Sequence, residues 1–267
     1  MMGRTHALTG VLAGLLVGRL IGLDTLPELG PFTATVAGYA LVPDLDHPSS
    51  AATRMLGPVT GLLSRALRAA SAWLYQHTKG PKDEPGGTHR HLTHTFVFAT
   101  VLGGICAVST ACWGPWAVVG WLAFGLLLAV DRLGTLTLVA FGVGAAAWLP
   151  ATLNSPQPAG DALLCALDQS TGWLGLAVAA GCAAHCLGDA LTESGCPFLW
   201  PFLRLRGETW YEIRPPRWLR FHTGKRIEQW LVFPAVALGC AAAVPGLMPQ
   251  AVSLFTEIAQ AGGGGLR

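Results

Sequence analysis

Charged residues are scarce in this chain. They make up 12% of its 267 residues, whereas hydrophobic residues make up 52% and the mean hydropathy is +0.47. Soluble domains carry roughly twice that share of charge, so the composition is that of an integral membrane protein. The net charge of +2 is small and its cations are spread over several loops, which argues against a nucleic-acid partner.

Signatures of several enzyme classes are also missing. The seven cysteines form no CxxC pair and most lie in apolar runs, which argues against a disulfide framework and a thiolate zinc site. The sequence contains no GxSxG, GxGxxG or Walker pattern and no recognisable Ser-Lys or catalytic-cysteine context. Nucleophilic side-chain catalysis is therefore disfavoured relative to a metal-activated water.

Long apolar segments are abundant. They lie at 7–23, 29–43, 95–113, 116–130, 135–150, 173–190 and 229–248. Some are shorter than the roughly 20 residues that cross a bilayer, so we predict an all-α, polytopic helical bundle with about five to seven spans. The first segment could also be a signal peptide, but no small-x-small cleavage site follows it, which favours an uncleaved helix.

The cations are distributed unevenly between the loops. With seven spans, 15 of the 17 Lys and Arg residues fall on one side, and the opposite loops carry none before Arg267. The positive-inside rule therefore places the N-terminus and the loops 51–88 and 196–228 in the cytoplasm. We expect 1–250 to form one membrane-embedded domain and the glycine-rich 251–267 to be a flexible tail.

Within the first long loop, 54–75 has the pattern of an amphipathic helix, followed by a polar linker. Two interpretations remain open. The helix could lie on the inner leaflet of the membrane, or it could connect two spans with one face in solvent.

Histidine and aspartate gather at the cytoplasmic ends of the predicted spans. They are His6 in the first span, Asp44, Asp46 and His47 after the second, His89, His91 and His94 before the third, and His185 and Asp189 in the sixth. Imidazole and carboxylate ligands suit zinc, manganese or iron. The pattern predicts a metal site at the inner interface of the membrane.

The spacing within each group supports this interpretation to a different degree. His185 and Asp189 are four residues apart in a helical run, so both face one way. Asp44 and Asp46 would project on one side of an extended segment between two prolines, or belong to a solvated turn. The HRHLTH stretch at 89–94 could alternatively bind lipid headgroups.

Five segments carry a family resemblance. They are His6, PDLDHP at 43–48, HRHLTH at 89–94, HCLGDALTESGCPFLWPF at 185–202 and FHTGKRIEQWLV at 221–232. Together they resemble the YdjM-like family of bacteria, described as LexA-regulated, membrane-bound, metal-dependent hydrolases of the inner membrane. The family pattern has glycine where this chain has His91, so His91 is not among the expected ligands.

More remotely, the ordered His and Asp residues are similar to those of zinc-dependent phospholipase C and P1 nuclease, which are all-helical and attack phosphodiesters with several zinc ions. The resemblance implies two or three ions, most readily zinc, with manganese or iron as alternatives. The expected ligands are His6, Asp44, Asp46, His47, His89, His94, His185 and Asp189. So many ligands exceed the four of one tetrahedral site.

The resulting hypothesis is a metal-dependent phosphoesterase whose substrate is a membrane lipid. Asp46 would steer the water, Arg90 would pair with phosphate, and Thr93 and Thr192 would orient ligands. One alternative is a non-enzymatic membrane protein with a structural or regulatory metal. Another is a metal-ion transporter, which requires polar residues at mid-depth in several spans.

Overall fold

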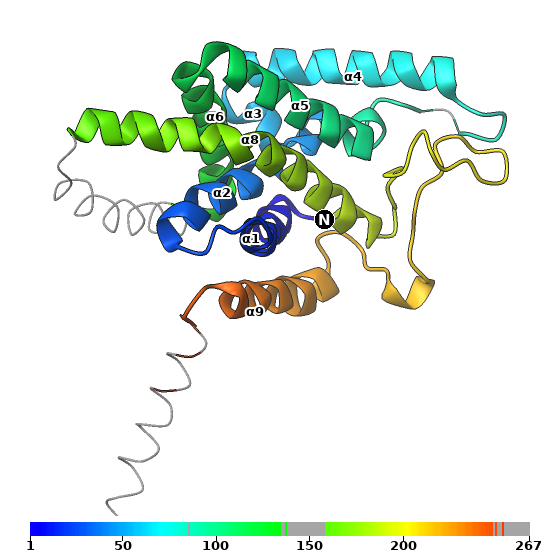
Figure 1. Ribbon diagram of the computed structural model, residues 1–267. Helices are drawn as coiled ribbons and strands as arrows, with labels where there is room; N and C mark the ends of the chain where they lie inside the picture. Colours follow the sequence, from blue (N-terminus) through cyan, green and yellow to red (C-terminus); the bar gives the residue numbers. More distant parts are fainter. Residues whose placement is uncertain (85, 135–136, 138–157, 248, 250–252, 254–267) are drawn as a thin grey trace, which may run out of the picture.

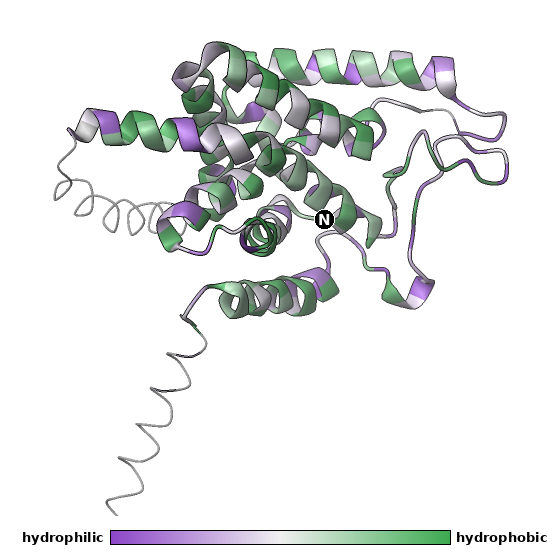
Figure 2. Cartoon of the chain, in the orientation of Figure 1, coloured by the Kyte–Doolittle hydropathy of each residue, from purple (hydrophilic) through white to green (hydrophobic). Residues whose placement is uncertain are grey.

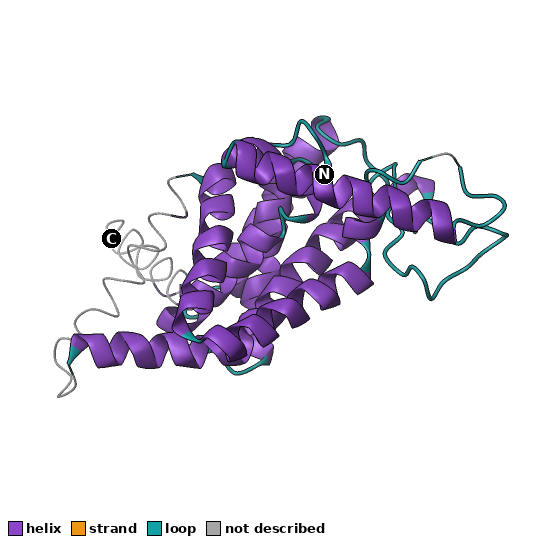
Figure 3. Cartoon of the chain, turned by 90° about the horizontal axis from the view of Figure 1, so that it is seen from above, coloured by secondary structure: helices purple, strands orange, loops and turns teal. Residues whose placement is uncertain are grey.

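The computed structural model describes residues 1–84, 86–134, 137, 158–247, 249 and 253. This part of the chain is helical, and its strand-like pairings are limited to three isolated bridges in loops. Figure 3 shows the helices joined by loops, with no strand drawn among the described residues. The all-α prediction is confirmed for this part of the chain.

The helices of the described residues are joined by connections of very different length, the longest running from Ala190 to Arg217. The α-helices are α1 (Gly3–Leu20), α2 (Leu26–Tyr39), α3 (Ala51–Met55), α4 (Pro58–Thr78), α5 (Phe96–Trp113), α6 (Pro115–Leu133), α8 (Ala159–Ala190) and α9 (Phe233–Ala243). Three short 3₁₀ helices are η1 (Pro43–Asp46), η2 (Leu92–His94) and η3 (Arg217–Leu219). A π-helical turn, η4 (Glu228–Val232), leads into α9.

Local sequence signals explain several helix ends. At α5, the Thr95 hydroxyl accepts a hydrogen bond from the backbone N–H of Phe98 at 3.0 Å, which satisfies an otherwise unpaired donor. Gly114 then ends this helix with φ 56°, a conformation that suits glycine. Gly57, with φ 55°, separates α3 from α4 in the same way, so the predicted helix at 54–75 is broken near its start.

Among the described residues, three helices are long and apolar enough to cross a membrane: Phe96–Trp113, Pro115–Leu133 and Gly160–Ala190. They correspond to the predicted spans at 95–113, 116–130 and 173–190. Figure 2 shows that α5 is largely hydrophobic along its length. Side chains such as Val101, Ile105 and Val108 are more than half exposed on its surface, as expected of a face that contacts lipid.

The other predicted spans differ from these. Helix α2 has only 14 residues, and the apolar helical stretch Glu228–Ala243 is also short of spanning length. Helix α1 has 18 residues but carries Arg4 and Arg19 and does not reach the hydropathy of a span. The predicted span 135–150 lies outside the described residues apart from Thr137, and the predicted tail 251–267 lies outside them apart from Ser253.

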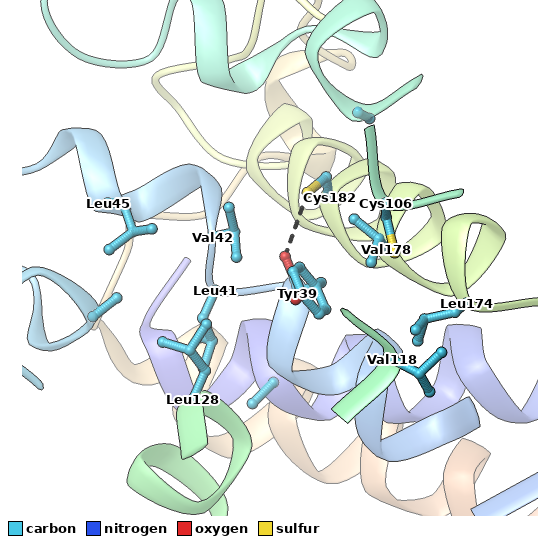
Figure 4. Packing of buried hydrophobic residues seen from close by; sticks show 13 residues of the cluster. Tyr39, Leu41, Val42, Leu45, Cys106, Val118, Leu128, Leu174, Val178 and Cys182 are labelled. Atoms are coloured by element: carbon cyan, nitrogen blue, oxygen red, sulfur yellow. Dashed lines mark hydrogen bonds between the residues drawn. The ribbon is translucent and has the colours of Figure 1, made fainter. Parts of the chain in front are cut away.

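The hydrophobic core lies where α2, α5, α6 and α8 meet. Tyr39 is at its centre, and its hydroxyl donates to the carbonyl of Trp121 at 3.0 Å. Figure 4 shows Cys182 of α8 pointing at the backbone oxygen of Tyr39, and Leu174 and Val178 on the same helix facing this cluster. The buried end of α2 is thereby fixed to α8.

Glycines let neighbouring helices approach to backbone contact, as two of the helix pairs illustrate. A Cβ on Gly103 of α5 would lie 2.5 Å from the carbonyl oxygen of Gly175 in α8, and one on Gly175 would lie 2.7 Å from the oxygen of Gly103. A Cβ on Gly38 of α2 would likewise overlap the carbonyl of Gly125 in α6. Such close approach through small residues is typical of helix packing in membranes.

Helix α4 reverses the usual pattern of a surface helix. Its inward face carries hydroxyl side chains, including the buried Ser71 and Tyr75, whereas Val59, Leu62 and Trp73 are more than 60% exposed. Figure 1 shows this helix along the outside of the bundle, with its last turns extending toward the loops that follow α8. An apolar outer face fits contact with lipid better than contact with water.

Candidate metal centre

Five of the predicted ligands converge where α1, η1, η2 and the end of α8 meet. They are His6, Asp44, His94, His185 and Asp189, and they form two overlapping groups whose ligand atoms lie within 4.8 Å of one another. One group is His94, His185 and Asp189, and the other is His6, Asp44 and His185. All of these side chains are fully buried except that of Asp44, which is 25% exposed.

His94 and His185 face each other through their Nε2 atoms, which are 3.2 Å apart. The Nδ1 atom of His185 lies 2.7 Å from the carbonyl oxygen of Ala40. A carbonyl can only accept, so Nδ1 of His185 carries the proton and, in a neutral ring, Nε2 carries a lone pair.

The tautomer of His94 follows from its neighbour Thr93. The Thr93 hydroxyl donates to Oδ2 of Asp46 at 2.6 Å and lies 2.9 Å from Nδ1 of His94. Because its one proton goes to the carboxylate, the hydroxyl oxygen must accept from Nδ1 of His94. Burial, the largest influence, lowers the pKa of His94 and favours a neutral ring, although the Asp46 carboxylate opposes this. When His185 is neutral as well, two lone pairs meet across 3.2 Å.

Asp189 provides a third atom at the same centre. Its Oδ2 lies 3.5 Å from Nε2 of His94 and 3.7 Å from Nε2 of His185, is buried, and makes no hydrogen bond. Nitrogen ligands about 2.0–2.1 Å from a tetrahedral zinc are roughly 3.3–3.4 Å apart, so the three atoms fit such an ion. Buried acceptors that point together are typical of a cation site, although the guanidinium of Arg90 also lies 3.2 Å from Oδ2 of Asp189.

The second group shares His185 with the first. The ring of His6 stacks on that of His185 with centroids 3.7 Å apart, and its Nε2 lies 3.1 Å from Oδ1 of Asp189 without the geometry of a hydrogen bond. Oδ1 of Asp44 lies 3.8 Å from Nε2 of His185. Because Nδ1 of His185 is bonded to Ala40, both groups depend on one nitrogen. They offer alternative positions for an ion unless the side chains rearrange.

Asp46 lies behind His94 and outside both groups. Its oxygens interact with Nδ1 of His89 at 2.5 Å, the Thr93 hydroxyl at 2.6 Å and the backbone N–H of Arg90 at 3.1 Å. Burial alone would raise the pKa of this carboxyl, but His94, His89 and Thr93 together hold it below its ordinary value. The ionised carboxylate thus orients the residues that flank the centre.

The prediction that Asp44 and Asp46 project on one side of an extended backbone is wrong. Residues 43–46 form the 3₁₀ helix η1, in which residues two apart point in different directions. Asp44 consequently faces His185, and Asp46 faces His89 and Thr93. The two carboxylates thus face different partners, and only Asp44 belongs to a group of converging ligands.

Arg90 enters the centre from the loop before η2. Its Nη2 lies 3.2 Å from Oδ2 of Asp189, while its Nη1 is buried without a hydrogen-bond partner. The residue has φ 57°, an unfavourable conformation for a side chain of this size. Backbone strain of this kind is often kept at functional sites, and the unpaired Nη1 is available to an anion.

Three other predicted residues lie at the margin of the centre. His47 is half-buried, packs edge-on against His89 with ring centroids 4.7 Å apart, and bonds to Ser49 through Nδ1. Thr192 is buried and donates to the carbonyl oxygen of Asp189 at 2.7 Å, which holds the end of α8. His47 and His89 belong to neither group of converging ligands.

Some contacts at the centre have no signature in the sequence. The Ala40 carbonyl acts through the backbone, so its residue type gives no indication of its role. The amino group of Met1 forms an ion pair with Oδ1 of Asp189. Ser71 of α4 donates to the carbonyl of Gly87 at 2.5 Å and accepts from the N–H of Leu92 at 3.2 Å, which fixes the loop that carries His89.

Comparison with known proteins identifies one family. The model described as "YdjM inner membrane protein" matches residues 1–252, which include every residue of the centre. No curated protein and no solved structure matches the chain significantly. The similarity to zinc-dependent phospholipase C and P1 nuclease therefore stays a hypothesis.

Proposed function

Because the chain belongs to the YdjM inner membrane protein family, we propose that it is a membrane-bound, metal-dependent hydrolase that cleaves a phosphoester of a membrane lipid. The proposal rests on three buried ligand atoms, from His94, His185 and Asp189, that converge on one point, where neutral imidazoles would leave two lone pairs for a cation. Three protein ligands leave one coordination position for water, as in catalytic zinc sites.

A bound zinc ion would supply a water with a pKa near 7 and would polarise a phosphoryl oxygen. Zinc suits the nitrogen and carboxylate ligands best, and manganese or iron is a possible replacement. We expect more than one ion only if His6 and Asp44 take a second ion without the shared nitrogen of His185.

The remaining residues would each have a distinct role. Asp46 and Thr93 keep the ring of His94 in the tautomer that presents Nε2, and Asp46 also accepts a hydrogen bond from Nδ1 of His89. Arg90 would bind a phosphate oxygen through its unpaired Nη1. Thr192 holds the backbone of Asp189.

The depth of the centre favours a lipid substrate. His94 precedes the first residue of α5 by two positions, and Asp189 lies in the last turn of α8. Both helices are candidate membrane spans, so the centre would lie at the level of the headgroups. The cations of the neighbouring loops would place this end in the cytoplasm.

A structural metal site is the alternative function. The Asp189 carboxylate already pairs with the amino group of Met1 and with Arg90, and its side chain is 1% exposed. If protein atoms fill every coordination position of the metal, no position remains for a water molecule. In a site without metal, a proton shared by the imidazoles of His94 and His185 would take the place of the ion.

Metal analysis and lipid turnover distinguish these functions. Protein purified without chelator should contain zinc or another transition metal, and His94→Ala and Asp189→Asn should lose both the metal and the release of product from phosphatidic acid or phosphatidylglycerol. His77→Ala is the matched control, because His77 is exposed on α4 and bonds only to the Trp73 carbonyl. Metal without turnover would favour the structural site, and wild-type protein without metal would refute both.

A further inference from the structure

The segment 215–231 presents large apolar side chains to its surroundings. Trp218 is 80% exposed, Trp230 79% and Leu231 66%. We call this region the 215–231 surface. Indole side chains at such exposure are unusual in water but common where a protein meets lipid headgroups.

The exposed charges of this surface are all positive. It contains four basic residues, and Arg217, Lys225 and Arg226 among them are exposed. Its one carboxylate, Glu228, is fully buried and accepts hydrogen bonds from the N–H groups of Met2 and Gly224, both at 2.6 Å. No acidic side chain on this surface therefore offsets the exposed cations.

The surface is held in place by its buried residues. Phe221 is 5% exposed and pairs with the segment after α8, where its carbonyl accepts from the N–H of Glu193 at 3.2 Å. Glu228 ties the π-helical turn to the start of α1 through Met2. The exposed indoles are thus carried by a fixed framework and not by a free tail.

The position of the surface along the bundle agrees with a membrane interface. Helix α5 is about 27 Å long at 1.5 Å per residue, close to the thickness of the hydrocarbon core. Trp113 ends this helix and Trp116 begins α6 beside it, and the two side chains are 69% and 86% exposed. Figure 1 shows the loop that follows α8, in yellow and gold, at the opposite end of the bundle. Exposed tryptophans thereby bracket the apolar helices.

We propose that the 215–231 surface docks into the headgroup layer of the membrane beside the metal centre and binds anionic phospholipids. Trp218 and Trp230 lie among the glycerol and upper acyl groups, and Arg217, Lys225 and Arg226 pair with phosphate oxygens. This inference depends on the exposed side chains and not on the proposed hydrolase activity. It would bring anionic lipids close to the centre whether or not the centre is catalytic.

Fluorescence quenching in vesicles tests the inference with the full-length protein. The protein is reconstituted into phosphatidylcholine with a minority of phosphatidylglycerol, with bromine on the acyl chains of one lipid at a time. The signal of the two indoles is the difference between wild type and Trp218→Phe/Trp230→Phe. We expect both brominated lipids to quench it, and brominated phosphatidylglycerol roughly two-fold more at equal mole fraction.

Charge variants separate lipid selection from simple insertion. Arg217→Gln/Lys225→Gln/Arg226→Gln should remove the preference for phosphatidylglycerol, as should high salt. Lys79→Gln/Lys82→Gln is the matched control, because both lysines are exposed in another loop, and should keep the preference. Equal quenching by the two lipids would overturn the binding of anionic lipid. Quenching of the two indoles by acrylamide but not by brominated lipid would overturn docking. Quenching by neither would also overturn it, because the indoles would then be covered by protein.

Discussion

Replacing Thr93 by valine removes one hydroxyl and nearly preserves the volume of the side chain. The change deletes the hydrogen bond to the Asp46 carboxylate at 2.6 Å and leaves Nδ1–H of His94 without an acceptor. A hydrogen bond to a charged group contributes about 1.5–3 kcal/mol, and a neutral one about 0.5–1.5 kcal/mol. We therefore expect the free energy of unfolding to fall by about 2–4 kcal/mol.

The same substitution should weaken metal binding more than it weakens the fold. Loss of a hydrogen-bond partner behind a metal-binding histidine typically reduces metal affinity about 10- to 100-fold. Competition with a coloured zinc chelator measures this affinity, and thermal unfolding in detergent measures stability. Thr93→Ser should restore most of both, because serine keeps the hydroxyl.

Thr110→Val is the matched control for this experiment. Thr110 is equally buried in α5, but its hydroxyl donates only to the carbonyl of Ala107 within the same helix. It should lose little stability and no metal affinity. If Thr93→Val binds metal as tightly as Thr110→Val does, the reasoning about the tautomer of His94 is refuted.

Further predictions concern the support of the centre. Ser71→Ala should lower metal affinity by less than about ten-fold, measured by the same competition, because it frees the loop before η2 without touching a ligand. Asp83→Asn should make 205–211 more sensitive to limited proteolysis, since its carboxylate accepts from the N–H groups of Thr209 and Trp210. Chelator should lower the unfolding temperature, and zinc should restore it in wild type but not in Asp189→Asn. Burial, and to a smaller extent Asp83, raises the pKa of Tyr75 from 10.0 to about 12, so the stability that its neutral phenol contributes is full below pH 10.0 and is lost as the pH rises toward 12. Unfolding measured against pH should show a shallower loss in Tyr75→Phe.

The convergence of the ligand residues could be predicted because two constraints act on them. Ionisable groups are placed at the ends of apolar helices, and the four-residue spacing of His185 and Asp189 turns both to one face. These constraints determine how deep each His and Asp residue lies in the membrane, and they can be read from the sequence without knowledge of tertiary contacts. The two groups of converging ligands contain five of the eight expected residues.

The roles of individual residues could not be predicted in the same way. Asp46 faces Thr93 and His89 because η1 is a 3₁₀ helix, which the prolines around it did not indicate. His91 packs edge-on against Tyr75, with ring centroids 4.4 Å apart, and this contact depends on the position of α4. Tertiary contacts of this kind are set by elements distant in the sequence, so local patterns carry little information about them.

Because Gly103 and Gly175 let α5 and α8 meet backbone to backbone, the distance between these two helices helps to set the distance between the imidazoles of His94 and His185. His94 lies two residues before α5 and His185 lies in α8, so a change in the distance between these helices would move the two rings relative to each other. A methyl group added at Gly103 would push α5 and α8 apart although it does not contact the metal centre. The geometry of the centre therefore depends on residues that do not contact it, and a small increase in volume at Gly103 would disturb the centre without removing a ligand.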